Sequence, residues 1–264
     1  MALEWDAGEY EVVSAPQTSW GTNFLKVFLE RRGLRGDEAV LDAGCGTGRV
    51  TELLLRHLPE GTVLAVDGSG AMVEAARRRF AGERRVRVER QDLLSLEVEA
   101  PVDVIFSTAT FHWIKDHDRL FGRLARALKP GGQLAAQCGG EGNISRATSA
   151  VEEVVREKRF SKYFEDFSDD KYYADPESTT QRLRAAGFED TEVWIHDEST
   201  SFGSVEELAR FLGTVVLGGH VKRLPEEERG PFVFAVAEKV AAIEDPPVMD
   251  YVRLNVLATA GRAA

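Results

Sequence analysis

Residues 40–48 read VLDAGCGTG, and this stretch decides the fold. An apolar run leads to a single carboxylate, Asp42, as is typical of the carboxyl end of a buried strand. Three glycines then alternate with other residues before a helical pattern begins: Gly44, Gly46 and Gly48. Because glycine has no Cβ, such a turn lets the backbone approach a ligand closely. The stretch therefore predicts a buried strand, a ligand-binding turn and a helix.

Strands and helices alternate outward from this turn through the first half of the chain. Strands are expected at residues 39–43, 62–66, 85–89, 102–107 and 133–138, and helices between them at 47–58, 71–80 and 118–128. Apolar strands joined by helices and short loops predict a parallel α/β sheet covered on both faces. Ligands bind such sheets at the carboxyl ends of the strands.

The second half of the chain has a different pattern, with more helix and a loop rich in aromatic and acidic residues at 163–173. Strands are expected at 191–197 and 251–259, with a helical insertion between them. We therefore expect one domain over residues 1–264, divided into an N-terminal lid and helix (1–36), a core (37–201), a helical cap insertion (202–245) and a final strand (246–264).

Composition limits the possible functions. The formal net charge is -11, which argues against a broad nucleic-acid footprint. No apolar run is long enough to span a membrane, and the first ten residues carry acids where a signal peptide carries bases. We expect a cytoplasmic protein without nucleic-acid or membrane partners. The two cysteines, Cys45 and Cys138, provide neither a disulfide framework nor a metal site.

The acids around the glycine turn indicate the ligand. The spacing is GxGxG, whereas dinucleotide folds use GxGxxG, and Asp42 would repel a diphosphate but attract a cation. Asp67 ends the next strand, where it can accept hydrogen bonds from a ribose diol, and Asp92 can receive an adenine amino group. Each acid alone is also consistent with a capping or turn residue. Together they describe S-adenosylmethionine rather than NAD.

Several motifs resemble those of class I S-adenosylmethionine-dependent methyltransferases: VLDAGCGTG, Val66-Asp67, Gln91-Asp92, LKPGG at residues 128–132 and LRAAGF at residues 183–188. The resemblance implies a Rossmann-like seven-stranded sheet, mostly parallel, whose last strand is antiparallel. It further implies that Gly44 and Gly46 pass under the methionine part, that Asp67 holds the ribose and that Asp92 and Leu93 meet the adenine. Gly68 is a further cofactor-binding candidate. Ser107 would lie beside the sulfonium, and Met72 would pack either on the adenine or in the helix core.

A narrower resemblance is to the trans-aconitate 2-methyltransferase and juvenile hormone acid methyltransferase group. It rests on Trp5, Tyr10, Gln17, Trp20, residues 111–114 (FHWI) and the helical cap. In that group a glutamine near the N-terminus and the tryptophan of the His-Trp pair bind a carboxylate, which Gln17 and Trp113 match. Tyr10, Trp20, His112 and Val216 are further candidates for acceptor binding.

Two acceptor chemistries follow from these residues. A carboxylate acceptor is already ionised at pH 7 and needs no base, whereas a hydroxyl, nitrogen or carbon acceptor would use His112 as general base. His112 can equally be a stacked ring with a backbone hydrogen bond. We expect a methyltransferase, a monomer or homodimer, that acts on a small organic acid, with base-assisted O-, N- or C-methylation as the alternative. A protein that binds the cofactor without turnover is the alternative from another class.

Overall fold

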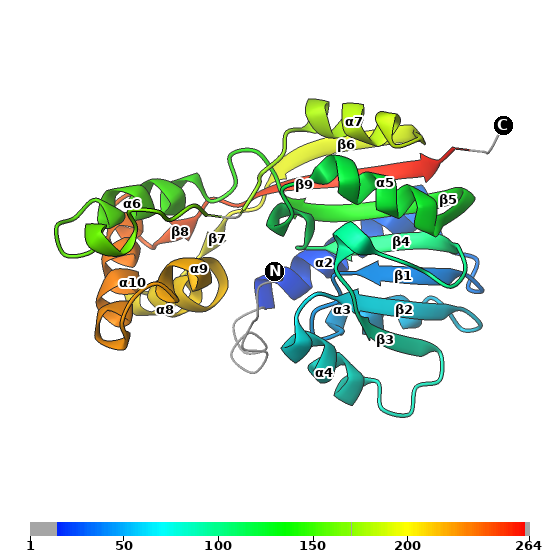
Figure 1. The fold of residues 1–264 in the computed structure, drawn as a ribbon, viewed down its shortest axis with the longest axis horizontal. Helices are drawn as coiled ribbons and strands as arrows, with labels where there is room; N and C mark the ends of the chain where they lie inside the picture. The colour runs from blue at the N-terminus through cyan, green and yellow to red at the C-terminus, as the bar shows by residue number, and fades with distance from the viewer. Residues whose placement is uncertain (1–14, 170, 262–264) are drawn as a thin grey trace.

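The computed structural model describes residues 15–169 and 171–261. Seven strands form one sheet in the order β3-β2-β1-β4-β5-β9-β6 (Figure 1). Only β9 runs antiparallel to its neighbours, β5 and β6. The strands are β1 (Ala39–Ala43), β2 (Thr62–Asp67), β3 (Val86–Arg90), β4 (Val102–Thr108), β5 (Leu128–Gly139), β6 (Phe188–Asp197) and β9 (Val252–Ala260). The expected mostly parallel sheet with an antiparallel last strand is confirmed.

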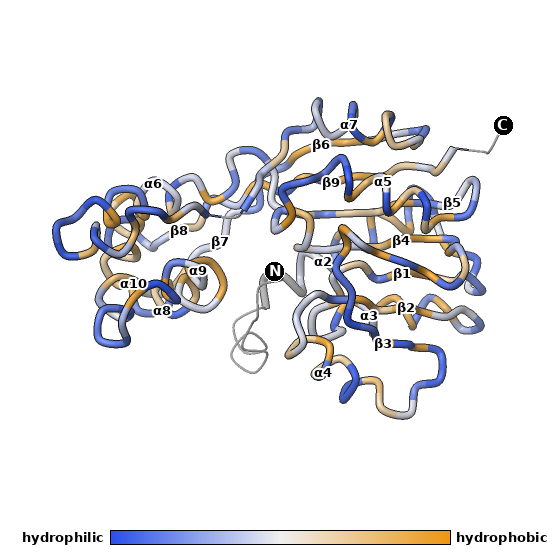
Figure 2. Tube along the Cα trace, viewed as in Figure 1, coloured by the Kyte–Doolittle hydropathy of each residue, from blue (hydrophilic) through white to orange (hydrophobic). Residues whose placement is uncertain are grey.

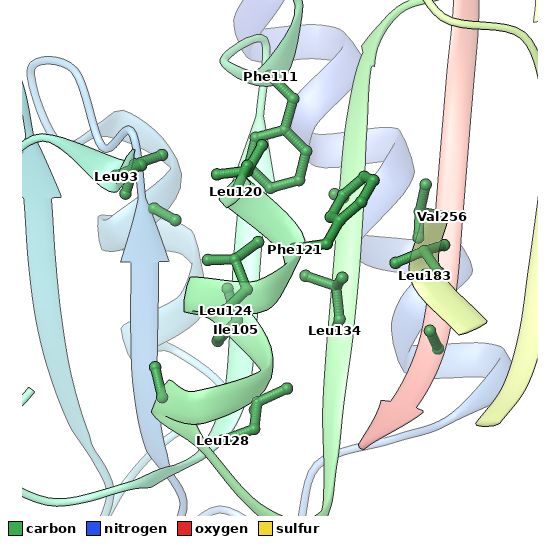
Figure 3. Packing of buried hydrophobic residues seen from close by; sticks show 14 of the residues in the cluster. Leu93, Ile105, Phe111, Leu120, Phe121, Leu124, Leu128, Leu134, Leu183 and Val256 are labelled. Atoms are coloured by element: carbon green, nitrogen blue, oxygen red, sulfur yellow. The ribbon is translucent and has the colours of Figure 1, made fainter. Parts of the chain in front are cut away.

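Helices cover both faces of this sheet because successive strand residues point to opposite sides. On one face Val104 and Phe106 of β4 pack against α2 (Ala15–Arg31) and α3 (Arg49–Leu55). On the other face Ile105 lies beside Leu124 of α5 (His117–Ala127), and Leu183 of α7 (Pro176–Ala185) lies beside Val256 of β9, as Figure 3 shows. The helix α4 (Gly70–Arg79) lies against β2 and β3. Hydrophobic residues are concentrated along the central strands (Figure 2).

A second, helical lobe lies beside the carboxyl ends of the strands (Figure 1). It contains α6 (Ser145–Val155), α8 (Val205–Phe211), the π-helix η4 (Leu212–Val216), α9 (Gly218–Val221) and α10 (Glu226–Ala241). The short strands β7 (Thr200–Ser201) and β8 (Val248–Met249) pair at its base. We call this lobe the cap. The helical cap insertion was predicted at residues 202–245. In the structure α6, which precedes that range, packs with it, because Ala147, Ala150 and Val154 lie in the same cluster as Phe232 and Val236 of α10.

Several boundaries differ from those expected. The chain leaves α5 directly in an extended conformation at Leu128, so β5 begins there and includes the Pro-Gly-Gly sequence that was expected to precede it. Short 3₁₀ helices lie in three loops: η1 (Leu93–Ser95), η2 (Phe111–Trp113) and η3 (Ser161–Tyr163). None of the helices in the described residues is long and apolar enough to cross a membrane.

Candidate active site

The glycine turn after β1 follows the conformation that its sequence predicts. Gly44, Gly46 and Gly48 all have positive φ, at 86°, 54° and 88°. A Cβ on Gly44 would lie 2.0 Å from Oγ1 of Thr110, so only glycine fits there. A Cβ on Gly46 would meet nothing within 4 Å. Gly44 is therefore needed for packing, whereas Gly46 leaves space beside the turn.

That space belongs to a cavity of about 390 Å³ at the carboxyl ends of the parallel strands. Pockets of 300–1,000 Å³ are typical of small-molecule sites. The cavity extends from the glycine turn to the cap and is lined by most of the residues that the sequence singled out: Trp20, Gly44, Gly46, Asp67, Gly68, Met72, Asp92, Leu93, His112, Trp113 and Val216. The fold thus brings the candidate cofactor and acceptor residues into one space.

Asp67 and Asp92 stand at the carboxyl ends of β2 and β3. Asp67 accepts backbone hydrogen bonds from Gly46 (2.9 Å) and Ser69 (2.8 Å), which orient its carboxylate across the glycine turn. Asp92 immediately precedes η1 and caps it by accepting a hydrogen bond from the backbone N–H of Leu94 (2.9 Å). Each carboxylate oxygen has further acceptor capacity, so both side chains remain suited to a ribose diol and an amino group.

Two residues predicted to contact the cofactor lie behind the cavity wall instead. Asp42 is 1% exposed and accepts a hydrogen bond from Thr51 (2.5 Å). Burial raises the pKa of Asp42 to about 7, against the lowering effect of the Thr51 hydrogen bond and with a further increase from the charge of Asp67. Ser107 donates its hydroxyl to the backbone carbonyl of Ala43 (2.6 Å), so this hydroxyl joins β4 to β1 beneath the turn.

His112 lies in η2, directly after β4, and is buried. Its Nδ1 accepts a hydrogen bond from the backbone N–H of Gly139 (3.3 Å), and its ring stacks on Tyr173 with centroids 6.0 Å apart. Burial lowers the pKa of His112 well below its usual value, and the positive charges of Arg253 and Lys171 lower it further. The ring is therefore neutral, with its proton on Nε2.

The cap side of the cavity contains polar residues that the sequence analysis did not select: Asn143, Lys171, Tyr173 and Arg253. Asn143 accepts from the backbone N–H of Val252 (3.0 Å), and Lys171 pairs with Asp169 (2.7 Å). One signal was available in the sequence, because Arg253 interrupts a strand that is otherwise mostly apolar. The other three lie in irregular segments whose positions no local pattern fixes.

Part of the expected acceptor site lies outside the described residues. Tyr10 and Trp5 precede the first described residue, and the side chain of Gln17 is not described although its backbone lies in α2. Within the described part of the chain, no cluster of three or more His, Cys, Asp or Glu side chains is arranged to hold a metal ion.

The residues at the turn end of the cavity fit S-adenosylmethionine. Carboxylates stand at two strand ends, and Asp42 lies below the turn. The Lys and Arg residues that line the cavity, Lys115, Lys171 and Arg253, come from segments after β4 and not from the glycine turn or the β2 end. A diphosphate would lack cationic partners at the turn, whereas a nucleoside with a cationic tail finds acceptors along its length.

Comparisons with known proteins agree with this geometry. Residues 40–132 match the family model described as a methyltransferase domain. The chain is 31% identical over 218 residues to trans-aconitate 2-methyltransferase from Methylobacterium nodulans, covering 82% of this chain and 75% of that enzyme. It is 27% identical to the Sinorhizobium medicae enzyme of the same name, covering 98% of this chain and all (100%) of the relative.

A solved structure shows the same fold. Phosphoethanolamine N-methyltransferase 2 from Haemonchus contortus, bound to phosphomonomethylethanolamine and S-adenosylhomocysteine, superposes with a TM-score of 0.61 at 22% identity. The match covers 97% of this chain, which spans 57% of the length of that protein.

The chain belongs to the class I S-adenosylmethionine-dependent methyltransferases. Within that class it falls in the group that includes the trans-aconitate 2-methyltransferases. Its cofactor is S-adenosylmethionine, which becomes S-adenosylhomocysteine on methyl transfer.

Proposed function

We propose that this methyltransferase esterifies a carboxylate of a small organic acid. The state of His112 carries the proposal, because it supports a carboxylate acceptor over one that needs a general base. The hydrogen bond from Gly139 occupies the lone pair of Nδ1, and Nε2 holds the ring proton. To act as a base, the ring would have to become an imidazolium in a buried site beside Arg253 and Lys171. An acceptor that is already an anion avoids this cost.

The names of the sequence relatives support the same chemistry. Both relatives are trans-aconitate 2-methyltransferases, which are named for methylating a carboxylic acid. A carboxylic acid with a pKa near 4 is ionised at neutral pH and is already a nucleophile. Catalysis then depends on positioning and on the exclusion of water.

The chain would divide its work between the two ends of the cavity. At the turn end, Gly44, Gly46, Gly68, Asp67, Asp92, Leu93 and Met72 would hold the cofactor. Asp42 and Ser107 would not contact the cofactor directly. Asp42 would act on it through its charge below the turn, and the Ser107 hydroxyl would hold β4 to β1. When bound, the cofactor would supply the methyl group, which would pass from the sulfonium sulfur to a carboxylate oxygen while the electron pair of the C–S bond stays on sulfur.

At the other end, neutral donors would orient the reacting carboxylate. His112 Nε2–H and the indole N–H of Trp113 are candidates on the described side, and Gln17 is a third from the sequence comparison. Neutral donors suit this task, because the negative charge of the carboxylate is lost on methylation. Trp20 and Val216, at 5% and 7% exposure, would help to exclude water from the acceptor.

A product screen tests the proposal. The enzyme is incubated with isotopically labelled S-adenosylmethionine and panels of carboxylic acids, phenols, amines and carbon acids, and products are identified by mass. We expect labelled products only with the acids, and we expect mild alkali to release methanol from them, as from esters. Alkali-stable methylation of a phenol or amine, with no ester from any acid, would contradict the proposal.

A further inference from the structure

Arg253 occupies an unusual position for an arginine. It lies on β9 between two neighbours, paired with Gly139 of β5 and His196 of β6. Only 3% of its surface is exposed, and its guanidinium carbon lies 4.6 Å from the ring centroid of Trp20. Arginine is rarely this buried unless it is paired with an anion. The sheet and α2 thus hold a cation inside the protein.

No anion of the described chain pairs with this cation. Among residues 15–169 and 171–261, no group accepts a hydrogen bond from the Arg253 side chain or forms an ion pair with it, and its Nε is buried without a partner. The nearby carboxylate of Glu198 acts on it only at longer range and contacts His196 instead (3.3 Å). Arg32, which is more exposed, has Glu192 as a partner at 2.8 Å. A buried guanidinium without a partner is costly, so this position fits an anion from outside the chain.

The cavity gives such an anion access. Arg253 lines it at the cap end, with Trp20, His112 and Tyr173. The charge of Arg253 acts to lower the pKa of both His112 and Tyr173, which line the same cavity, although burial raises the pKa of Tyr173 as a whole. Lys171 lines the same region, but Asp169 already balances its charge at 2.7 Å. The acceptor half thus carries a net positive charge that a substrate anion can neutralise.

We infer that Arg253 binds a second carboxylate of the acceptor, one that is not methylated, and so selects dicarboxylic or polycarboxylic acids. This inference rests on the proposed function. A carboxylate loses its charge as it is methylated, so a guanidinium bound to the reacting group would stabilise the ground state more than the transition state. A guanidinium bound to a spectator carboxylate is equally favourable in both states. Arg253 therefore sets acceptor affinity and leaves the rate of the chemical step unchanged.

The test compares acceptors that differ by one charge. Succinate, glutarate and trans-butenedioate are each assayed beside their monoamides, which keep one reactive carboxylate and nearly the same shape. For wild type we expect KM for the diacid to be about 10²-fold below that of the monoamide, with similar kcat. In Arg253→Met, KM for the diacid should rise about 10²-fold to the monoamide value, while the monoamide KM stays unchanged. Arg253→Lys should restore part of the difference, because it keeps the charge without the planar fork.

Arg31 offers a matched control. Its guanidinium carbon also lies 4.6 Å from a tryptophan ring, that of Trp194, but it is exposed and pairs with Glu192 (2.7 Å). Arg31→Met should leave both KM values unchanged. An equal loss with diacids and monoamides in Arg253→Met, or a loss confined to kcat, would overturn the inference and assign Arg253 a structural role.

A binding measurement separates this inference from the proposed function. Calorimetric titration of the diacid into the enzyme saturated with S-adenosylhomocysteine needs no turnover. We expect the diacid to bind wild type, and we expect its affinity for Arg253→Met to be about 10²-fold lower. Without acceptor, the thermal midpoint of Arg253→Met should be no lower than that of wild type. If no acid yields an ester, the proposed function fails, and this titration still decides whether Arg253 binds a dicarboxylate. Equal diacid affinity in the two proteins would refute the role of Arg253.

Discussion

The backbone N–H of Gly139 donates to Nδ1 of His112 over 3.3 Å, so the last residue of β5 fixes the tautomer of a ring on the loop after β4. A side chain at position 139 would not fit, because its Cβ would lie 2.8 Å from Nδ2 of Asn143 and 2.8 Å from Cε1 of Tyr173. The neighbouring strand end therefore holds His112 as a neutral donor.

This arrangement predicts how a change at His112 affects the rate. Asparagine can place an oxygen near the position of Nδ1, so His112→Asn keeps an acceptor for Gly139 and removes Nε2. If His112 only orients a carboxylate, we expect kcat to fall less than about 10-fold, whereas loss of a general base costs roughly 10²–10⁴-fold. Steady-state kinetics with an acid identified by the product screen measures the difference.

The pH profile gives an independent check on the same residue. The pKa of His112 lies well below its usual value, so the ring does not titrate between pH 6 and 9. With S-adenosylmethionine held at saturation, we expect kcat/KM for the acceptor to be flat over that range and to fall only near pH 4–5, where the acceptor carboxyl itself is protonated. A limb that titrates near pH 6.5–7 in wild type and disappears in His112→Asn would show that the ring acts as a base.

Asp42 predicts that cofactor binding releases a proton. Its pKa is raised to about 7, mainly by burial, so most molecules carry a protonated Asp42 at pH 6.5. A cationic ligand above the turn favours the ionised form and lowers this pKa. Calorimetry of S-adenosylmethionine binding, in buffers with different ionisation enthalpies, should detect proton release at pH 6.5 and almost none at pH 9. Asp42→Asn should bind without this release.

The same shift predicts the effect of Asp42 on stability. The carboxyl has a pKa of 3.8 when unperturbed and about 7 in the folded protein, so the folded state binds more protons between these values. Its contribution to stability is complete below about pH 4 and is lost as the pH rises through 7. Asp42→Asn should therefore raise the thermal midpoint of the cofactor-free enzyme at pH 8 more than at pH 5. A midpoint that falls equally at both values would contradict this assignment.

Alanine substitutions at Gly44 and Gly46 should affect different properties of the enzyme. In Gly44→Ala the Cβ overlaps Thr110 at 2.0 Å and φ is 86°, so we expect a loss of stability on the order of 3 kcal/mol. In Gly46→Ala the new Cβ meets no protein atom within 4 Å, so only backbone strain should lower the stability, by about 1 kcal/mol. Its methyl group enters the cavity, so S-adenosylhomocysteine affinity should fall by more than stability does. Denaturant titration and calorimetry on both variants distinguish the two effects.

Asp67 should contribute directly to cofactor affinity. We expect Asp67→Ala to weaken S-adenosylhomocysteine binding by about 1–3 kcal/mol, because ribose hydroxyls lose their acceptor in a buried site. Part of any effect will come from the backbone N–H groups of Gly46 and Ser69, which lose their partner. Adenine affinity provides the control, since it does not require the ribose and should change much less. An equal loss for adenine would point to collapse of the turn instead.

The sequence alone indicates that several candidate cofactor residues lie around one cavity, for a physical reason. Gly44, Asp67 and Asp92 follow consecutive parallel strands, and the topology of such a sheet brings strand ends to one edge. Their placement around one cavity could therefore be predicted from the sequence, although their roles in cofactor binding remain predictions. Ser107 shows the limit of this reasoning, since alternation along β4 sets the direction of its side chain and its hydroxyl bonds to Ala43.

The residues at the acceptor end of the cavity were harder to predict from the sequence, because they come from segments far apart in the chain. Asn143, Lys171 and Arg253 meet only after α6 packs against α10 and β9 enters the sheet. The apolar face of α6 gave no local sign that its partner would be the cap rather than the sheet. Helical periodicity identifies a buried face but does not say what covers it.

The position of β9 also has a consequence for biosynthesis. β6 is made before β9, yet β9 lies between β5 and β6 in the finished sheet. A nascent chain can pair β1 to β5 as they emerge, but the edges of β5 and β6 stay open until residues 252–260 leave the ribosome. Open strand edges invite aggregation, so this interval is the vulnerable period of synthesis. The strand that closes the gap also carries Arg253, so the acceptor pocket stays incomplete until β9 has been made.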